Sequence, residues 1–388
     1  MLDKIRIKRQ RILALDLLRG LFLLIILADH LQWTPSLFFQ FTTAYTGMVA
    51  SAAEGFFVIS GILVGYIYGP KILSSTKQTC IRIWKRGLLL YILAVGFTLL
   101  YTGWAALIPD GYPRSSVPLA SSITDALTGA LSLTYSYGWA DFLSRYAVFM
   151  LAAPLALWLI AKRRAYIVLV ASGLIWLILR ETAPWLTFTA WQIIFFSGVV
   201  IGYYLPTIEK ELVKTEKRKR ILKTFVYASI FSFIAVTLFV AIPPLLLLSF
   251  DIIINNDITN ALNSLNGVRE QILTYFDKTT MSAPRLLIGT IWFIALYSLF
   301  RTYETEINKR TRGVLLLLGQ YSLFVYGFQA FLIFTIDSLL PLSSGPNPPY
   351  ILLYTVFGVM CAVLTYIATR LYAKRASVYT KAKEIMSK

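Results

Sequence analysis

The sequence predicts an all-α, polytopic membrane protein of about ten transmembrane helices. Hydrophobic residues make up 57% of the 388-residue chain and charged residues only 14%, against about 25% in soluble domains. Several apolar runs approach the roughly 20 residues that a helix needs to cross a bilayer. Backbone polar groups cannot stay unpaired in lipid, so we expect these runs to be helices. We expect one multi-pass domain over residues 1–388, in an inner or plasma membrane.

The apolar runs define the individual spans. The two weakest predictions are residues 165–180, which form a short run, and residues 222–248, which contain Pro243-Pro244. A further apolar stretch around residues 119–138 is typical of a re-entrant or interfacial segment. The ten predicted spans are residues 12–33, 47–69, 85–103, 143–161, 165–180, 187–205, 222–248, 285–301, 314–337 and 350–373.

Basic residues alternate between the loops, and this alternation orients the chain. The net charge is +18, and Lys and Arg concentrate in every second loop, as in the run Lys217–Arg220. The positive-inside rule then places both termini in the cytoplasm and the long loops 104–142 and 249–284 outside it. The rule accounts for the charge without a nucleic-acid partner. The two cysteines are too few for a disulfide framework.

The first span carries ionisable side chains. Asp16, Arg19 and His30 share one helix face, with His30 roughly 21 Å beyond Asp16 toward the outer end; Asp29 points about 100° away. His30 is the only histidine of the chain. Each charge costs about 2.5–3.5 kcal/mol at mid-helix, so such groups normally face protein or a water-filled cavity. We therefore expect a functional site on this face; the alternative is an interfacial Asp16–Arg19 salt bridge and a structural histidine.

The second span supplies a carboxylate, Glu54, on the same helix face as a stripe of glycines. The glycines recur every fourth residue from Gly61 to Gly69, a pattern that lets helices pack closely. Counted from outside, Glu54 and His30 lie at similar depth. This predicts a His30–Glu54 pair in which the carboxylate fixes the imidazole tautomer and supports its positive charge. The alternative is a structural hydrogen bond from Glu54 to the backbone or to Ser51.

Polar residues also occur within or beside the later spans. Taken singly, each is as typical of a membrane-interface anchor as of a substrate pocket. The residues that we retain as possible substrate-binding groups are Asp141, Arg145, Gln192, Arg285 and Gln329.

Five segments together carry a resemblance to a known family. They are Leu15–Gly20 with Asp29-His30, Ser51–Phe57 with Ser60-Gly61, Trp191-Gln192 with Phe196–Gly198, Phe276–Lys278 with Pro284-Arg285, and Gly319–Leu323. In this order the segments resemble the OpgC-type membrane proteins of the wider acyltransferase-3 superfamily. The first two together are the most specific, and the match runs over most of the chain.

The resemblance implies ten membrane spans and an enzymatic activity. It implies transfer of an acyl group, succinyl in the best-known members, from cytoplasmic acyl-CoA to a glucan outside the membrane. The superfamily's first-span histidine corresponds to His30, and its upstream basic residue to Arg19. Many relatives have a histidine in the ninth span where this chain has Gln329. A mechanism that needs two histidines is therefore excluded.

The predicted function is a membrane O-acyltransferase with His30 as general base, oriented by Glu54. Arg19 and Asp16 would bind the donor. The expected partners are acyl-CoA as co-substrate, an extracytoplasmic glycan acceptor and the lipid bilayer, with no tightly bound cofactor and no metal. One alternative is a transporter or exporter of a polar glycan or lipid-linked sugar, with the buried groups as a proton relay, although no inverted repeat is visible. The other is a non-catalytic scaffold or sensor.

Overall fold

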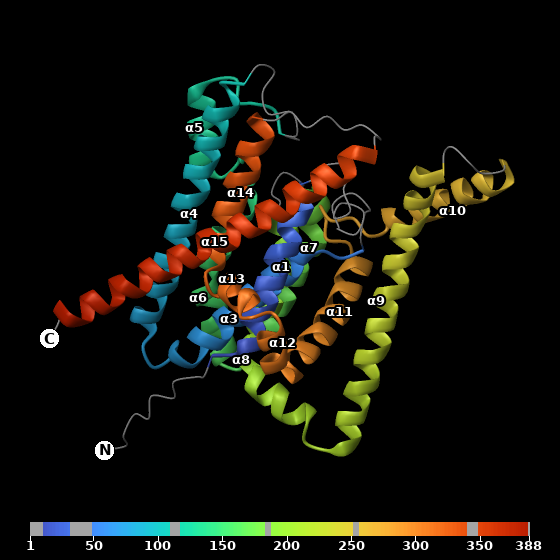
Figure 1. The fold of residues 1–388 in the computed structure, drawn as a ribbon. Coiled ribbons are helices and arrows are strands. Elements are labelled where there is room, and N and C mark those ends of the chain that lie inside the picture. The colour runs from blue at the N-terminus through green and yellow to red at the C-terminus, as the bar shows by residue number, and fades with distance from the viewer. Residues whose placement is uncertain are drawn as a thin grey trace, which may run out of the picture. The chain divides into compact units, whose positions relative to one another are not determined.

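The computed structural model describes residues 11–31, 49–108, 117–182, 188–250, 256–339 and 348–386. Within these ranges the chain forms helices joined by short connections, and no strand occurs (Figure 1). The helices divide into two compact units, each described by itself below. The first unit comprises Met1–Leu13 and Phe57–Ile221, and the second comprises Ala14–Phe56 and Leu222–Lys388.

The helices confirm the predicted class of protein. Eight of the described helices are long and apolar enough to cross a membrane, or nine when one sharply bent pair counts as a single span. Helix α1 (Leu13–Leu31) falls on the first predicted span and has 19 residues. It is not among the eight, because it carries three charged residues, Asp16, Arg19 and Asp29. With α1 included, each of the ten predicted spans contains described helix, while residues 32–33, 47–48 and 187 of those spans lie outside the described residues.

The first unit is a bundle of spanning helices. Helix α4 packs on α6, α7 packs on α8, and α6 contacts both α7 and α8. The bounds are α3 (Ala52–Tyr68), followed by a 3-10 turn over Gly69–Lys71, then α4 (Thr76–Ala105), α5 (Ile123–Ser132), α6 (Asp141–Ala161), α7 (Ala165–Thr182) and α8 (Phe188–Leu212). Helix α3 belongs to this unit from Phe57 onward.

The glycines of α3 meet a second pair of glycines on α8. An added Cβ at Gly65 would lie 2.0 Å from the carbonyl oxygen of Val199, and one at Gly202 would lie 2.0 Å from the carbonyl oxygen of Ile62. Real Cβ atoms do not approach backbone this closely, so only glycine allows these helices their present separation. The predicted close-packing role of the α3 glycines is thereby confirmed.

Helix α5 lies in the stretch for which a re-entrant or interfacial segment was predicted. Its Ala126 and Ala130 are buried, whereas Ile123, Leu127 and Leu131 are exposed along an adjacent face. An exposed apolar stripe beside a polar helix start is typical of a helix that lies in the membrane interface. Ser122 caps the helix, because its Oγ accepts a hydrogen bond from the Asp125 backbone N–H.

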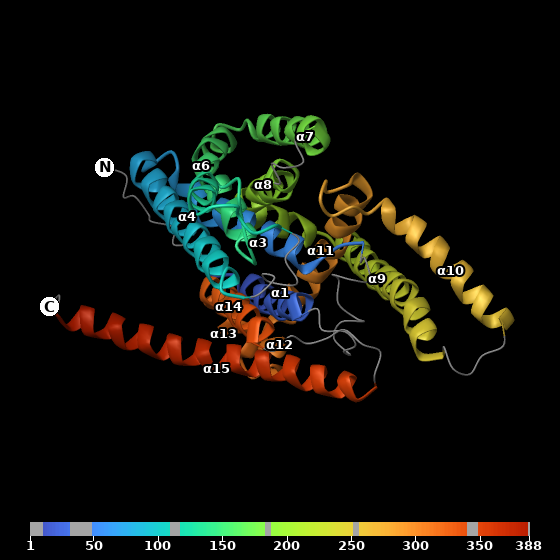
Figure 2. The ribbon, with the colours of Figure 1, turned by 90° about the horizontal axis from the view of Figure 1, so that it is seen from above.

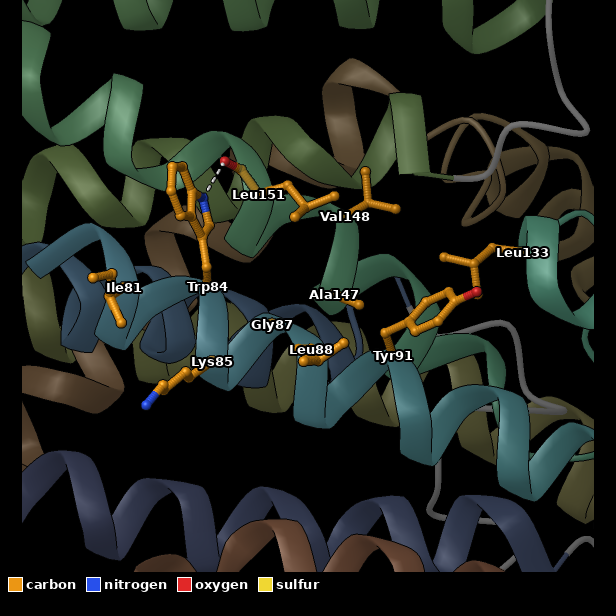
Figure 3. A pocket seen from close by; sticks show the side chains of 10 residues that line it. All are labelled: Ile81, Trp84, Lys85, Gly87, Leu88, Tyr91, Leu133, Ala147, Val148 and Leu151. Atoms are coloured by element: carbon orange, nitrogen blue, oxygen red, sulfur yellow. Dashed lines mark hydrogen bonds between the residues drawn. The ribbon is translucent and has the colours of Figure 1, made fainter. Parts of the chain in front are cut away.

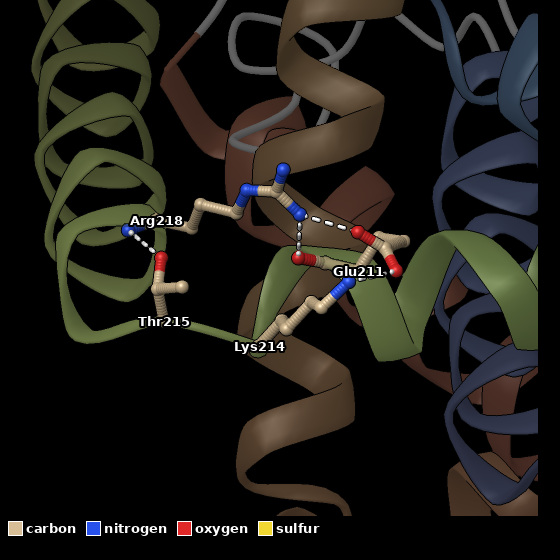
Figure 4. A network of polar contacts seen from close by, with 4 residues as sticks. All are labelled: Glu211, Lys214, Thr215 and Arg218. Carbon is tan, nitrogen blue, oxygen red and sulfur yellow. Dashed lines mark hydrogen bonds and ion pairs between the residues drawn. The ribbon is translucent and has the colours of Figure 1, made fainter.

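The turn from α8 into α9 is held by a polar network (Figure 4). Arg218 Nη1 donates to Glu211 Oε2 at 2.5 Å and to the Glu211 carbonyl at 2.9 Å. Lys214 binds the other carboxylate oxygen at 3.1 Å, and Thr215 Oγ1 accepts from the Arg218 N–H. The network uses two of the basic residues of this loop to close a short helix–helix connection.

The second unit contains α1 and the C-terminal helices. Helix α15 packs along both α13 and α14 (Figures 1 and 2). The bounds are α9 (Glu216–Phe250), α10 (Asn256–Thr274), α11 (Ala283–Thr302), α12 (Glu304–Arg310), α13 (Val314–Gln320), α14 (Ser322–Leu339) and α15 (Pro348–Met386). The predicted continuous span 314–337 is in fact broken, since α13 and α14 meet at Tyr321 with a bend of 94°.

A proline in α9 explains how α10 is attached to it. Proline lacks a backbone N–H, so Pro244 cannot donate to the carbonyl four residues earlier, at Val240. Arg269 of α10 fills this place, because its Nε donates to the Val240 carbonyl at 2.8 Å. Burial lowers the pKa of the Arg269 guanidinium, which remains charged at any physiological pH.

The first half of helix α1 contacts α12 and α13. Glu304 of α12 accepts a hydrogen bond from the Ala14 N–H at 3.2 Å, so a carboxylate caps the positive end of the α1 dipole. An added Cβ at Gly20 would lie 2.0 Å from the Leu315 carbonyl oxygen, and one at Gly319 would lie 1.8 Å from the Asp16 carbonyl oxygen. This close crossing of α13 over the start of α1 precedes the bend at Tyr321.

Candidate functional site

The buried charges are confined to one part of the chain. Seven charged side chains are buried among the described residues, and all seven belong to the second unit. Burying a charge is costly unless it is paired or used, so their concentration marks the second unit as the place of the site. The seven residues are Asp16, Arg19, Asp29, Glu54, Arg269, Arg285 and Asp337. No cluster of three or more metal-ligating side chains occurs in the described ranges.

Arg19 is held between two other helices. Its Nη2 donates to Ser322 Oγ at the start of α14. Its guanidinium carbon lies 5.2 Å from the centroid of the Phe56 ring of α3, a cation–π distance. Arg19 is therefore a fixed positive charge near the end of α1 that the loop charges assign to the cytoplasmic side.

Glu54 forms a buried ion pair with Arg285 of α11. Arg285 Nε and Nη2 each lie 2.6 Å from Glu54 Oε1, and Ser51 Oγ donates to the same oxygen at 3.0 Å. Gly289 lies one turn beyond Arg285, and an added Cβ there would be 3.3 Å from Glu54 Oε2. The hydrogen bond to Ser51, expected as the structural alternative for Glu54, is thus present together with a charge partner that the sequence reasoning did not assign.

The loop before α11 adds a second carboxylate beside Arg285. Arg285 Nη1 donates to the Phe276 carbonyl at 2.8 Å. Asp277 Oδ2 accepts from the Thr280 backbone N–H at 2.6 Å and from its hydroxyl at 2.5 Å. Partial burial alone would raise the pKa of the Asp277 carboxyl, but the hydrogen bonds from Thr280 and the charge of Arg285 lower that pKa below its usual value.

His30 lies in the last turn of α1 and is partly buried. Leu27 and Leu31, on either side of it, pack in one apolar cluster with Ile333 of α14 and with Tyr354 of α15. The C-terminal turn of a helix stabilises positive charge, which suits an imidazole that takes up a proton. The helix end that carries His30 is therefore packed against two other helices.

The neighbours of Glu54 fix its level along α1. Gly55 lies against the Phe22 ring, where an added Cβ would be 2.4 Å from Cε2, and Phe56 lies beside Arg19. These contacts place the start of α3 beside the middle of α1, roughly 12 Å from His30 by the helix rise. The pairing of Glu54 with His30 stays a prediction, and the contact that the structure establishes for Glu54 is with Arg285.

Three of the predicted residues lie in the first unit and have their own partners. Asp141 and Arg145 form an ion pair one turn apart in α6 at 2.6 Å, and the Arg145 guanidinium carbon lies 4.9 Å from the centroid of the Trp191 ring. Gln192 Oε1 accepts from Ser172 Oγ at 2.5 Å, and its Nε2 donates to the Ser172 carbonyl at 2.7 Å. These contacts tie helices of the bundle together.

Sequence reasoning missed two buried acids of the second unit. Asp29 was set aside because it points away from the Asp16–His30 face, yet it is also buried. Asp337 is buried near the end of α14 and was not singled out. The available signal was the presence of an acid inside an apolar run, which is rare enough to mark a site by itself.

A cavity of about 460 Å³ lies between α4 and α6 in the first unit (Figure 3). Its walls are largely aliphatic and aromatic, Trp84 Nε1 donates to the Leu151 carbonyl across it at 3.3 Å, and Lys85 is its only charged lining residue. None of the predicted site residues lines it. We therefore assign the cavity no part in the chemistry.

Fold and buried charges together define a multi-pass membrane protein whose second unit holds the buried charges of the described residues. The comparison with protein families then identifies it: the OpgC protein family matches residues 11–376, nearly the whole chain, and the chain belongs to that family. Membership implies a membrane acyltransferase that modifies a glucan. No curated protein and no solved structure matches the chain.

Proposed function

We propose that the protein transfers an acyl group, succinyl or a similar one, from cytoplasmic acyl-CoA to a hydroxyl of an extracytoplasmic glucan or other glycan. The observation that carries this proposal is the confinement of all seven buried charges of the described residues to the unit that also holds His30. Arg19 near one end of α1 suits the phosphates of the donor, and His30 near the other end suits the reacting hydroxyl. Family membership supports the reaction class.

In the proposed reaction His30 acts as general base. Its imidazole accepts the proton of the acceptor hydroxyl while that oxygen attacks the thioester carbonyl. The carbon–sulfur bond then breaks, and the imidazolium returns the proton to the departing CoA thiolate. The imidazole is unchanged at the end, so one histidine suffices and Gln329 takes no part in proton transfer.

The Glu54–Arg285 pair suits the acceptor side. Loop charge places the start of α11 outside the cytoplasm, and Arg285 there also contacts the Phe276 carbonyl. Paired carboxylates and guanidinium groups are good hydrogen-bond partners for sugar hydroxyls. We propose that Glu54 and Arg285, at the level of the middle of α1, hold the acceptor.

The test is acyl transfer in membranes by wild type, His30→Ala and His30→Gln. Mass spectrometry of the surface glycans reads the acyl group. We expect loss of the acyl group in both variants, with unchanged protein level and thermal unfolding. Glu216→Gln serves as the control, because it alters only an exposed ion pair with Lys219, and it should behave as wild type. Full activity of the stably inserted His30→Ala protein would end the proposal.

A transporter of a polar glycan or lipid-linked sugar is the second candidate. The observation in its favour is the broken span α13–α14, since transporters often bind substrate where a helix is interrupted. Transporters of that kind carry interruptions in matched pairs, and the described residues contain one bent pair. Flux of unmodified glycan into membrane vesicles, without acyl labelling, would favour the transporter.

A further inference from the structure

Gln329 of α14 is a buried amide whose polar atoms have no hydrogen-bond partner in the described part of the chain. Its side chain is 1% exposed, and neither Oε1 nor Nε2 has a partner among the residues that the structure describes. It is the only buried amide side chain in those ranges for which both the acceptor and the donor lack a partner. Gln192, the matched buried amide of the first unit, uses both atoms in hydrogen bonds. A buried amide in this state is costly unless something binds it.

The contacts on either side place Gln329 on the α14 face that packs on α1. Ser322, seven residues earlier, contacts Arg19, and Ile333, four residues later, belongs to the same apolar cluster as Leu27. Spacings of seven and four residues keep all three α14 residues on one helix face. Gln329 therefore lies opposite the middle of α1, between the levels of Arg19 and His30.

We infer that Gln329 binds the pantetheine arm of the acyl-CoA donor through one of its amide groups. The inference rests on the proposed function, in which the arm must pass from the Arg19 end of α1 toward His30. An amide of the arm offers one N–H and one carbonyl, and Gln329 has one free acceptor and a free donor to meet them.

Gln329 is neutral, and this indicates that it binds the uncharged arm of the donor and not the charged phosphates. Phosphates are met best by guanidinium groups, and Arg19 of the second unit supplies one. A neutral amide further along α1 from this cation suits the neutral segment that joins phosphates to thioester. The geometry thus assigns the phosphates to Arg19 and the arm to Gln329.

Calorimetric binding of two probes to the purified full-length protein tests the inference. The first probe is CoA, and the second is the adenosine bisphosphate portion of CoA, which lacks the arm. We expect Gln329→Leu to weaken CoA binding about tenfold, because an amide of the arm would be buried unpaired. Binding of the adenosine bisphosphate should be the same in wild type and variant.

Thr365→Val is the control variant. The Thr365 hydroxyl of α15 is also buried without a partner in the described residues, but it lies outside the α14 face that packs on α1. We expect its CoA binding to equal that of wild type. An equal loss in Thr365→Val and Gln329→Leu would overturn the inference, because the loss would then reflect general disturbance of packing.

The outcomes also separate this inference from the proposed function. If wild type binds CoA more tightly than the adenosine bisphosphate and Gln329→Leu binds both as wild type does, the role of Gln329 is wrong and the proposed function stands. If wild type binds neither probe, the acyl-CoA reaction is wrong and the role of Gln329 falls with it.

Discussion

Arg285 and Glu54 meet through a single carboxylate oxygen, with Nε and Nη2 of the arginine both 2.6 Å from Oε1. The two residues are 231 positions apart in the chain, and both side chains are almost fully buried. A pair of this kind is costly to break, since removal of one partner leaves a buried charge. The pair therefore couples the stability of the second unit to the proposed acceptor side.

The first prediction concerns this pair. Glu54→Leu and Arg285→Met should each lower the free energy of unfolding by about 3–5 kcal/mol, because each leaves one charge buried alone. The double variant should recover most of that loss. Thermal unfolding in detergent measures the stability, and acyl transfer is measured on the same samples. We expect the stable double variant to be inactive; single variants as stable as wild type would contradict the prediction.

A second prediction concerns the crossing of α1 and α13. Gly319→Ala would place a Cβ 1.8 Å from the Asp16 carbonyl oxygen, so the two helices must move apart. We expect a loss of about 1–3 kcal/mol, the usual cost of overpacking, or failure to accumulate in the membrane. Gly173→Ala is the matched control, because nothing lies within 4 Å of a Cβ there. Equal stability of the two variants would show that α13 does not approach α1 this closely.

The third prediction uses the proline of α9. Arg269→Met should destabilise the protein by about 1–3 kcal/mol, since it leaves the buried Val240 carbonyl without a donor. Pro244→Ala restores a backbone N–H that can bond to this carbonyl. In the Pro244→Ala background, Arg269→Met should therefore cost less. A double-mutant cycle of unfolding free energies reads the coupling, and strict additivity would argue against the contact.

The pH dependence of the loop before α11 gives a fourth prediction. The folded-state pKa of Asp277 lies below its unfolded value, so its carboxylate stabilises the loop above the unfolded pKa, about 3.9. That stabilisation is lost as the pH falls through the lower, folded pKa. We expect the stability difference between wild type and Asp277→Asn to shrink as the pH is lowered from about 5 toward 2.

Thermal unfolding at several pH values measures this difference. Thr280→Val removes one of the hydrogen-bond donors to Asp277, so it should raise the folded-state pKa and move the loss of stability to higher pH. A wild-type advantage over Asp277→Asn that does not change across the acid range would contradict the predicted linkage.

The helices were predictable from the sequence because the residues of each span are enough to identify it as a membrane helix. An apolar run such as Ala165–Thr182 must be a helix in lipid whatever surrounds it. The break at Tyr321 was not predictable in this way. No proline marks it, and its position depends on how closely Gly319 approaches Asp16, a contact between distant parts of the chain. Local pattern therefore gave the spans, and tertiary packing gave the bend.

The individual residues of the candidate site were predictable from the sequence, but the contacts between them were not. His30, Arg19 and Glu54 stand out because ionisable groups are rare in spans. The partner of Glu54 could not be predicted, because helix periodicity gives the face on which a residue lies but not the helix that packs against that face. Arg285 was therefore one residue among five possible ones. The orphaned amide of Gln329 likewise becomes visible only when its neighbours are known.

The contacts of α1 bear on how the protein is made. This helix leaves the ribosome well before its partners, because Ser322 follows Arg19 by 303 residues and Glu304 follows Ala14 by 290 residues. Until those residues are synthesised, the charges of α1 lack the groups that cover them in the folded protein. Helix α1 is therefore a poor substrate for membrane insertion. It reaches its final contacts only after the last third of the chain has been synthesised. Chains truncated before α12 should be degraded or left to chaperones, which makes completion of translation the checkpoint for assembly.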